Sequence, residues 1–235
     1  MPPRIPSELE PRWPRARMIE RRASSARAAL GLLPLQRCDP RQLLVGVSIA
    51  QLVETQGEWM RFFALDNPTE AQCLLEGRGA WSGALVPIAD AHEYDGRNEA
   101  LLVHPVHSLL RRTFTIAHHL GHRALGHRQQ AHRMRASTDA TDTAAPWRAV
   151  LASEDAEETG NADVTIPLWP CQTMRLSPFR LIDEAPATEY GLALLIPYAP
   201  LCQLTEAGDQ DDAIAARYGV SVAVLHLRRR LTGLL

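Results

Sequence analysis

Two histidines four residues apart, His118 and His122, constrain this chain more than any other feature of its sequence. On an α-helix this spacing places both imidazoles on one face and about one turn apart, close enough to bind one metal ion together. The flanking residues favour a helix, because Ser108 is a good N-cap residue that follows the extended run 101–105. Residues of core type then recur at helical spacing and predict a buried stripe: Leu109, Thr113, Ile116, Leu120 and Ala124.

The residues around the pair make it more specific than its spacing alone. In a chain with nine histidines such a spacing often arises by chance, so the pair alone is weak evidence of a metal site. However, the run FTIAHHLGH (114–122), preceded by Arg111, resembles the R-x-x-F-T-x-A-H-E-x-G-H helix of the ImmA/IrrE family of zinc metallopeptidases. In this chain His119 stands at the position of the family's glutamate.

A second segment, residues 184–197, resembles the same family. Its sequence EAPATEYGLALLIP is similar to the family's E-x-x-A-N-x-F-A-x-x-L-L-M-P helix, whose first glutamate is the third zinc ligand. The resemblance therefore implies a Zn2+ site formed by His118, His122 and Glu184, with the fourth position open to water. Taken alone, Glu184 has the alternative interpretation of a solvated charge at the start of a helix.

The resemblance also implies an α+β fold. We expect a compact zincin-like domain with a small β-sheet, the HHxGH metal-binding helix, a second ligand helix and a C-terminal helical segment of helix-turn-helix type. The sequence pattern agrees, since residues 41–57 predict an apolar helix or a helix running into a strand. Short β-type runs follow at 58–65, 80–88 and 99–105, and the last of them leads directly into the helix predicted from about residue 109.

The chain divides into three parts. Residues 1–38 predict a Pro/Arg-rich N-terminal arm and helix, residues 39–203 the metallopeptidase-like domain, and residues 204–235 the C-terminal helical segment. The middle part carries an insertion at about 129–180 between the two motifs. A connection of this length predicts either a lid or docking loop over the cleft, or a disordered insertion.

Two arginine-rich segments have two interpretations each. The N-terminal helix contains several arginines, and the C-terminal helix contains Arg228, Arg229 and Arg230 after a turn at Gly219 and an N-cap at Ser221, as in half of a helix-turn-helix. Both helices either pack on the domain or bind DNA. We favour packing for the N-terminal segment because Glu8, Glu10 and Glu20 interleave with its arginines. We favour it for the C-terminal segment because the resemblance implies that a similar segment belongs to the family's peptidase fold.

The overall composition bounds the environment of the protein. With 46% apolar residues the chain can bury a full core, yet no apolar run approaches the roughly 20 residues of a membrane span. The N-terminus lacks the charged-then-apolar order of a secretory signal, which favours a cytoplasmic location. The four cysteines are scattered and predict reduced, partly buried thiols: Cys38, Cys73, Cys171 and Cys202.

His119 is the candidate catalytic residue, and three interpretations of it stay open. In the family the glutamate takes a proton from water and passes it to the leaving amine. His119 could act as this base, an acidic residue of the insertion such as Glu154 or Glu158 could replace it, or the domain could bind zinc without cleaving peptides. Electrostatics favours the last, because an imidazolium beside Zn2+ suffers like-charge repulsion.

The best understood members of the family cleave a transcriptional repressor of the helix-turn-helix type. The resemblance therefore implies a regulatory metalloprotein that engages such a repressor and switches on phage-like, mobile-element or stress genes, by limited proteolysis if His119 leaves activity intact. The alternative is a catalytically inactive pseudopeptidase that binds a partner protein or DNA.

Overall fold

The structure, a computed structural model, describes residues 14–46, 49–55, 57–58, 83–87, 99–127 and 181–234. These ranges contain α1 (Pro14–Ala29), the 3-10 helix η2 (Pro40–Gly46), β1 (Ile49–Val53), β2 (Gly83–Pro87), β3 (Glu99–Val103), α4 (Leu109–Ala124), α6 (Leu181–Leu195), α7 (Tyr198–Glu206), α8 (Asp211–Tyr218) and α9 (Val222–Thr232). The predicted arm at 1–13, the insertion at 129–180 and all but Glu58 of the β-type run 58–65 lie outside the described residues.

A small mixed sheet lies on one side of α4. Its strand order is β1-β3-β2, with β1 parallel and β2 antiparallel to the central strand β3. All five residues of β3 are buried, as expected for a strand that is covered on both faces. Of the two alternatives for 41–57, the structure has the second, because a 3-10 helix that ends at Gly46 is followed by strand β1 from Ile49. Together with the helices, this sheet confirms the α+β class.

Helix α4 begins where the sequence predicts. The hydroxyl oxygen of Ser108 accepts a hydrogen bond from the backbone N–H of Arg111, which satisfies one of the free donors of the first turn. Thr113, Ile116 and Leu120 are buried as expected. Leu109 is 52% exposed, so the prediction that it joins the stripe was wrong, and the buried stripe begins at Thr113, one turn later.

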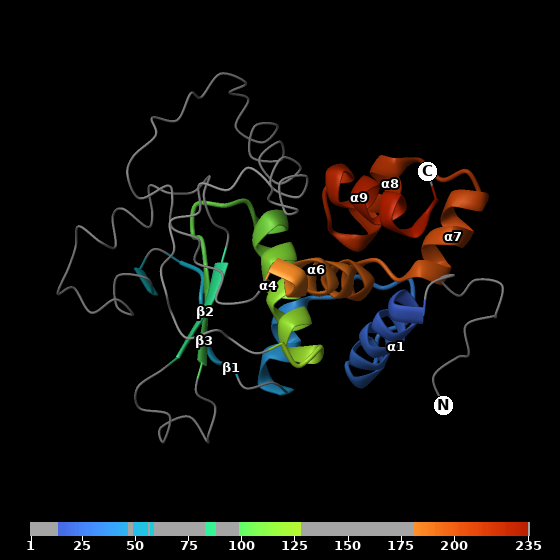
Figure 1. Ribbon diagram of the computed structural model, residues 1–235. Coiled ribbons are helices and arrows are strands. Elements are labelled where there is room, and N and C mark those ends of the chain that lie inside the picture. Colours follow the sequence, from blue (N-terminus) through green and yellow to red (C-terminus); the bar gives the residue numbers. More distant parts are fainter. Residues whose placement is uncertain are drawn as a thin grey trace.

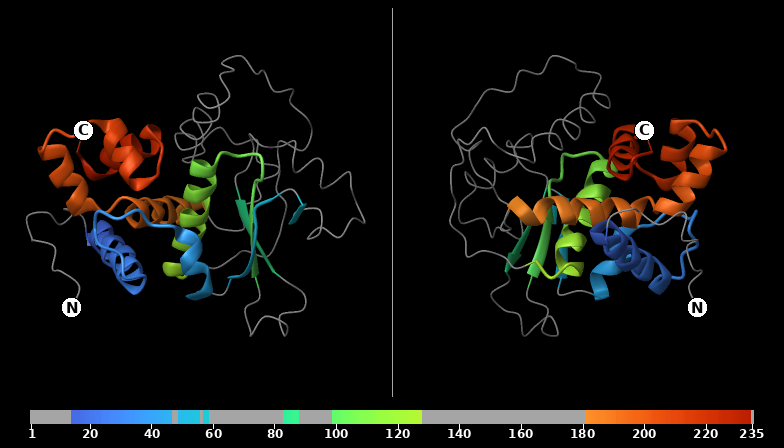
Figure 2. Two further views of the ribbon diagram at one scale, coloured as in Figure 1. Left: turned by 180° about the vertical axis from the view of Figure 1, so that it is seen from behind. Right: turned by 45° about the vertical axis from the view of Figure 1, so that its right-hand side comes forward.

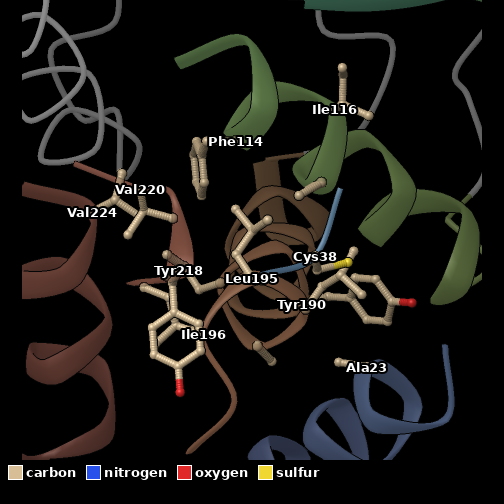
Figure 3. Close-up of a cluster of buried hydrophobic side chains, with 14 of the residues drawn as sticks. Ala23, Cys38, Phe114, Ile116, Tyr190, Leu195, Ile196, Tyr218, Val220 and Val224 are labelled. Atoms are coloured by element: carbon tan, nitrogen blue, oxygen red, sulfur yellow. The ribbon is translucent and has the colours of Figure 1, made fainter. Parts of the chain in front are cut away.

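Helix α6 passes through the middle of the molecule. Figure 1 shows it crossing α4, with α1 on one side of it and α7 to α9 on the other, and Figure 2 shows the same order from two further directions. Its residues 190–195 are all buried, which explains why its second half is apolar on every face. In Figure 3, Leu195 of this helix lies in a cluster with Phe114 of α4 and Tyr218 at the end of α8. The metal-motif helices and the C-terminal helices therefore share one core.

Arginines from both ends of the chain are buried within this core. Arg27 of α1 donates to the backbone carbonyl of Leu194 at 2.8 Å, and Arg228 of α9 forms an ion pair with Glu20 of α1. Arg229 pairs with Asp211, whereas Arg230 is exposed. Because buried guanidinium groups must be paired, these contacts fix α1 and α9 to the domain, as the packing interpretation expects.

The C-terminal turn follows the sequence expectation. Gly219 adopts φ 66°, a left-handed conformation that ends α8 at little steric cost. Ser221 then accepts a hydrogen bond from the backbone N–H of Val224 at 3.2 Å and caps α9. Both predictions are confirmed.

Two of the four cysteines lie within the described residues. Cys38 and Cys202 are free and buried, and burial raises the pKa of the Cys38 thiol to about 11. They are therefore protonated, unreactive thiols, as predicted, while Cys73 and Cys171 lie outside the described part of the chain. None of the described helices has the length and apolar character needed to cross a membrane.

Candidate metal centre

Two glycines allow α4 and α6 to cross in very close contact. A Cβ atom added to Gly191 would lie 2.9 Å from the backbone nitrogen of His118, closer than real Cβ contacts. A Cβ atom on Gly121 would overlap the backbone carbonyl oxygen of Ala187 even more severely. Because neither position has a side chain, the histidine face of α4 lies directly against the first turns of α6.

This crossing brings the three predicted ligands together. The Nε2 atoms of His118 and His122 are 3.1 Å apart, and Oε2 of Glu184 lies 3.2 Å from the first and 3.7 Å from the second. Four-coordinate zinc with bonds of about 2.0–2.1 Å to nitrogen and oxygen places its ligand atoms roughly 3.3 Å apart. The observed separations scatter around that value, so the donor set fits the edges of a tetrahedron. Among the described residues, His118, His122 and Glu184 form a group of side chains close enough together to hold one metal ion.

The electrostatics of the group suits a cation. Burial alone would raise the pKa of the Glu184 carboxyl, but its contacts with the imidazoles of His118 and His122 hold that pKa well below its usual range. Burial lowers the pKa of His122 to about 4, although its contact with Glu184 acts in the opposite direction. At neutral pH Glu184 is therefore ionised and His122 neutral, which are the states that a divalent cation requires of its ligands.

His119 lies beside the group without belonging to it. Its ring centroid is 5.2 Å from that of His118 and 6.0 Å from that of His122, and its side chain is almost fully buried. Its ring hydrogen-bonds to the backbone of Gly83 in β2, where an added Cβ would lie only 3.0 Å from Nε2. The Nδ1 atom is buried and has no hydrogen-bond partner among the residues that the structure describes.

The protonation state of His119 follows from its surroundings. Burial, followed by the charges of His118 and His122, lowers the pKa of His119 well below 6.5, although Glu184 and the Gly83 backbone act in the opposite direction. The imidazole is therefore neutral at neutral pH. The alternative bases of the insertion, Glu154 and Glu158, lie outside the described residues.

Two further side chains contact the rings of His118 and His122, and the family motifs assign a role to neither of them. Thr188 places its Oγ1 3.0 Å from Nδ1 of His118, and Nδ1 of His127 lies 3.0 Å from Nδ1 of His122. A sequence signal exists for Thr188, because it follows Glu184 by four residues and so lies on the same face of α6 one turn later. Each ligand imidazole is thus held at the nitrogen that points away from the metal position.

The metal-free protein is expected to lose stability as the pH falls from about 6.5 to about 4. In the folded chain burial lowers the pKa of His122 from 6.5 to about 4, so the unfolded chain takes up this proton at a higher pH. The contribution is fully present above pH 6.5 and lost on the way to pH 4, at most on the order of 3 kcal/mol. Urea unfolding at several pH values measures it, and His122→Asn should flatten the pH dependence. If the free energy of unfolding of His122→Asn depended on pH as strongly as that of the parent, His122 would not be the group responsible.

The chain was compared with protein-family models, with curated proteins and with solved structures, and none of the three comparisons found a match. The function proposed below is therefore based on the two short sequence motifs and on the geometry of His118, His122 and Glu184.

Proposed function

We propose that this chain is a zinc metalloprotein of the ImmA/IrrE type, with a zincin-like domain, that acts on a transcriptional repressor of the helix-turn-helix class. The observation that supports it most is the convergence of His118, His122 and Glu184 from two helices, with donor atoms 3.1 to 3.7 Å apart. Two imidazoles and one carboxylate match the three protein ligands of catalytic zinc sites. The repressor as target is taken from the family resemblance.

The expected chemistry is hydrolysis of a peptide bond within the repressor. Zinc bound to the three ligands supplies a Lewis acid that polarises a carbonyl group and makes water more acidic. His119 is the candidate proton acceptor, because its Nε2–H is engaged by the Gly83 backbone and its buried Nδ1 carries the free lone pair. General base catalysis of this kind contributes roughly 10²- to 10⁴-fold.

A second candidate function is a pseudopeptidase that binds the repressor without cutting it. The observation in its favour is the setting of His119, whose pKa is lowered well below 6.5 by burial and by the neighbouring histidine charges. A base with so low a pKa accepts a proton poorly, and its protonated form would be repelled by a nearby dication. In this case the domain would serve as a binding module that engages the repressor without chemistry at the metal.

Cleavage of a purified helix-turn-helix repressor distinguishes the two candidates. For the peptidase, the purified protein should contain zinc by elemental analysis and should cut the repressor, and both a chelator and Glu184→Ala should abolish the cut. His119→Glu should then accelerate cleavage, because it restores a carboxylate base.

Other outcomes of this experiment are equally decisive. If the parent protein binds the repressor uncut, with or without chelator, and only His119→Glu cleaves it, the pseudopeptidase is correct. If the parent contains no zinc and neither binds nor cleaves the repressor, both candidates are wrong.

A further inference from the structure

We propose that His127, oriented by Asp183, is a positioning residue that keeps the metal-binding nitrogen of His122 free of its proton. The inference rests on the zinc centre proposed above and assigns a role to two residues outside the ligand set. Its basis is the contact between the imidazoles of His122 and His127, which meet because of the way helix α4 ends.

The C-terminal cap of α4 brings these two rings together. The backbone N–H of Gly126 donates to the carbonyl of Arg123, and the N–H of His127 donates to the carbonyl of His122 at 2.9 Å. Gly126 adopts φ 71°, the left-handed conformation that glycine enters without strain. This pattern is the Schellman motif, in which the side chains of the third-last helical residue and of the second residue after the cap meet.

In this cap the two meeting side chains are His122 and His127. A hydrophobic pair commonly occupies these positions, but here two Nδ1 atoms face each other at 3.0 Å, with ring centroids 5.1 Å apart. One of the two nitrogens must donate and the other accept, because a neutral imidazole carries a single N–H. The tautomer of one ring therefore sets the tautomer of the other.

Asp183 decides which ring accepts. Its Oδ1 lies 4.0 Å from Nε2 of His127, beyond direct hydrogen-bond distance but close enough for electrostatic attraction. A carboxylate on this side favours the His127 tautomer with the proton on Nε2, which leaves Nδ1 as the acceptor. His122 then donates from Nδ1, and its Nε2 presents a lone pair toward His118 and Glu184.

This arrangement opposes a competing state of the metal-free site. Nε2 of His122 lies 3.1 Å from Nε2 of His118 and 3.7 Å from the carboxylate of Glu184, so it could carry a proton toward either group, which would block the metal. Thr188 supplies the corresponding contact at Nδ1 of His118. When both rings hold their protons on Nδ1, three acceptor atoms converge with no proton between them, which is unfavourable unless a cation binds.

The N-terminal part of helix α6 supplies both a proposed metal ligand and the side chains that contact the histidine rings from the other side. Glu184 is the ligand, while its neighbour Asp183 and Thr188 one turn later lie behind the two histidines. Losing contacts of this kind typically costs 10- to 100-fold in metal affinity.

Zinc affinity of full-length variants tests the inference. His127→Leu places an apolar side chain of similar size in the cap and removes the acceptor, and we expect it to bind zinc 10- to 100-fold more weakly than the parent. His127→Asn is the matched variant, because its Oδ1 occupies the place of the histidine Nδ1. It should recover affinity to within about fivefold of the parent. Asp183→Asn should lose less than His127→Leu, because it removes charge and leaves the cap intact.

Two spectroscopic readouts separate proton placement from packing. In the metal-free protein, ring nitrogen chemical shifts should show the His122 proton on Nδ1 in the parent and in His127→Asn, but redistributed toward Nε2 in His127→Leu. With Co2+ in place of zinc, the visible absorption bands should shift in His127→Leu alone.

The outcomes also separate this inference from the proposed function. Equal zinc affinity in His127→Leu and the parent, or equal loss in His127→Leu and His127→Asn, would overturn the role of His127 and leave the zinc centre standing. A parent protein that binds no zinc would overturn both. Should His127→Leu fail to fold, the nitrogen shifts of His127→Asn and Asp183→Asn decide, since an Nε2 proton on His122 of the parent contradicts the inference.

Discussion

Glu184→Gln is expected to weaken zinc binding about a thousandfold. Zinc affinities of protein sites correspond to binding free energies on the order of 10 to 16 kcal/mol, so each of about four ligands contributes roughly 3 to 4 kcal/mol. The amide is nearly the same size as the carboxylate but carries no negative charge. Glu184 supplies the one anion of the three donors and is ionised at neutral pH, because its contacts with His118 and His122 hold its pKa below the usual range. A competition titration with a chromophoric chelator measures the loss.

Glu189→Gln is the matched control for this experiment. Glu189 lies on the same helix, five residues later, and pairs with Arg15 at the surface of α1 instead of facing the histidines. Its substitution should change zinc affinity by less than about twofold, since an exposed ion pair contributes little. Equal affinities for Glu184→Gln and Glu189→Gln would show that Glu184 is not a ligand.

Gly121→Ala is expected to destabilise the fold by about 3 kcal/mol and to weaken zinc binding in the same variant. In a helix alanine is normally favoured over glycine by about 1 kcal/mol, so helix propensity alone predicts that Gly121→Ala stabilises the fold. The added methyl group would overlap the backbone of Ala187, which cannot rotate away as a side chain could. Helix α6 would have to move away from α4, and Glu184 would move with it away from His118 and His122. Denaturant unfolding and zinc titration measure the two losses.

Gly46→Ala serves as the comparison. Among the described residues, apart from the chain neighbours of Gly46, no atom lies within 4 Å of the position that a Cβ on Gly46 would occupy, and its backbone is not in the left-handed region. Stability and zinc affinity should both stay close to those of the parent, within about 0.5 kcal/mol. If Gly121→Ala were as stable as Gly46→Ala, the close crossing of α4 and α6 would be contradicted.

The local features of the fold could be predicted because they depend on neighbours in sequence. Ser108 and Ser221 cap their helices by bonds that span three residues, and Gly219 ends α8 through its own backbone conformation. The strand at 99–103 follows from an apolar run with β-type residues. Leu109 shows the limit of such patterns. Helical spacing predicts which side of the helix a residue faces, but not whether other segments cover that side along its whole length, and Leu109 is exposed.

The setting of His119 could not be read from its position in the motif. The residue after a metal-ligating histidine faces the place where a base is needed, and this made it the catalytic candidate. Its hydrogen bond to Gly83 depends on where strand β2 lies, and its low pKa depends on burial beneath that strand. Both are consequences of packing between segments that lie far apart in the sequence.

His127 shows how a local signal acquires meaning from the tertiary structure. Its position after Gly126 indicates a helix cap, and the cap brings it to His122 whatever the rest of the fold does. Whether its Nδ1 donates or accepts depends on Asp183, which another helix supplies.

The sequence by itself determined the helices, their caps and the spacing that places His118 and His122 on one face, because backbone hydrogen bonds and side-chain periodicity act over one or two turns. Only the tertiary structure decided that Glu184 meets this pair, that Thr188 and His127 hold the rings from behind, and that His119 turns toward β2. These contacts depend on how closely α4 and α6 cross, and that distance is set by Gly121 and Gly191 acting on the backbone of the opposite helix.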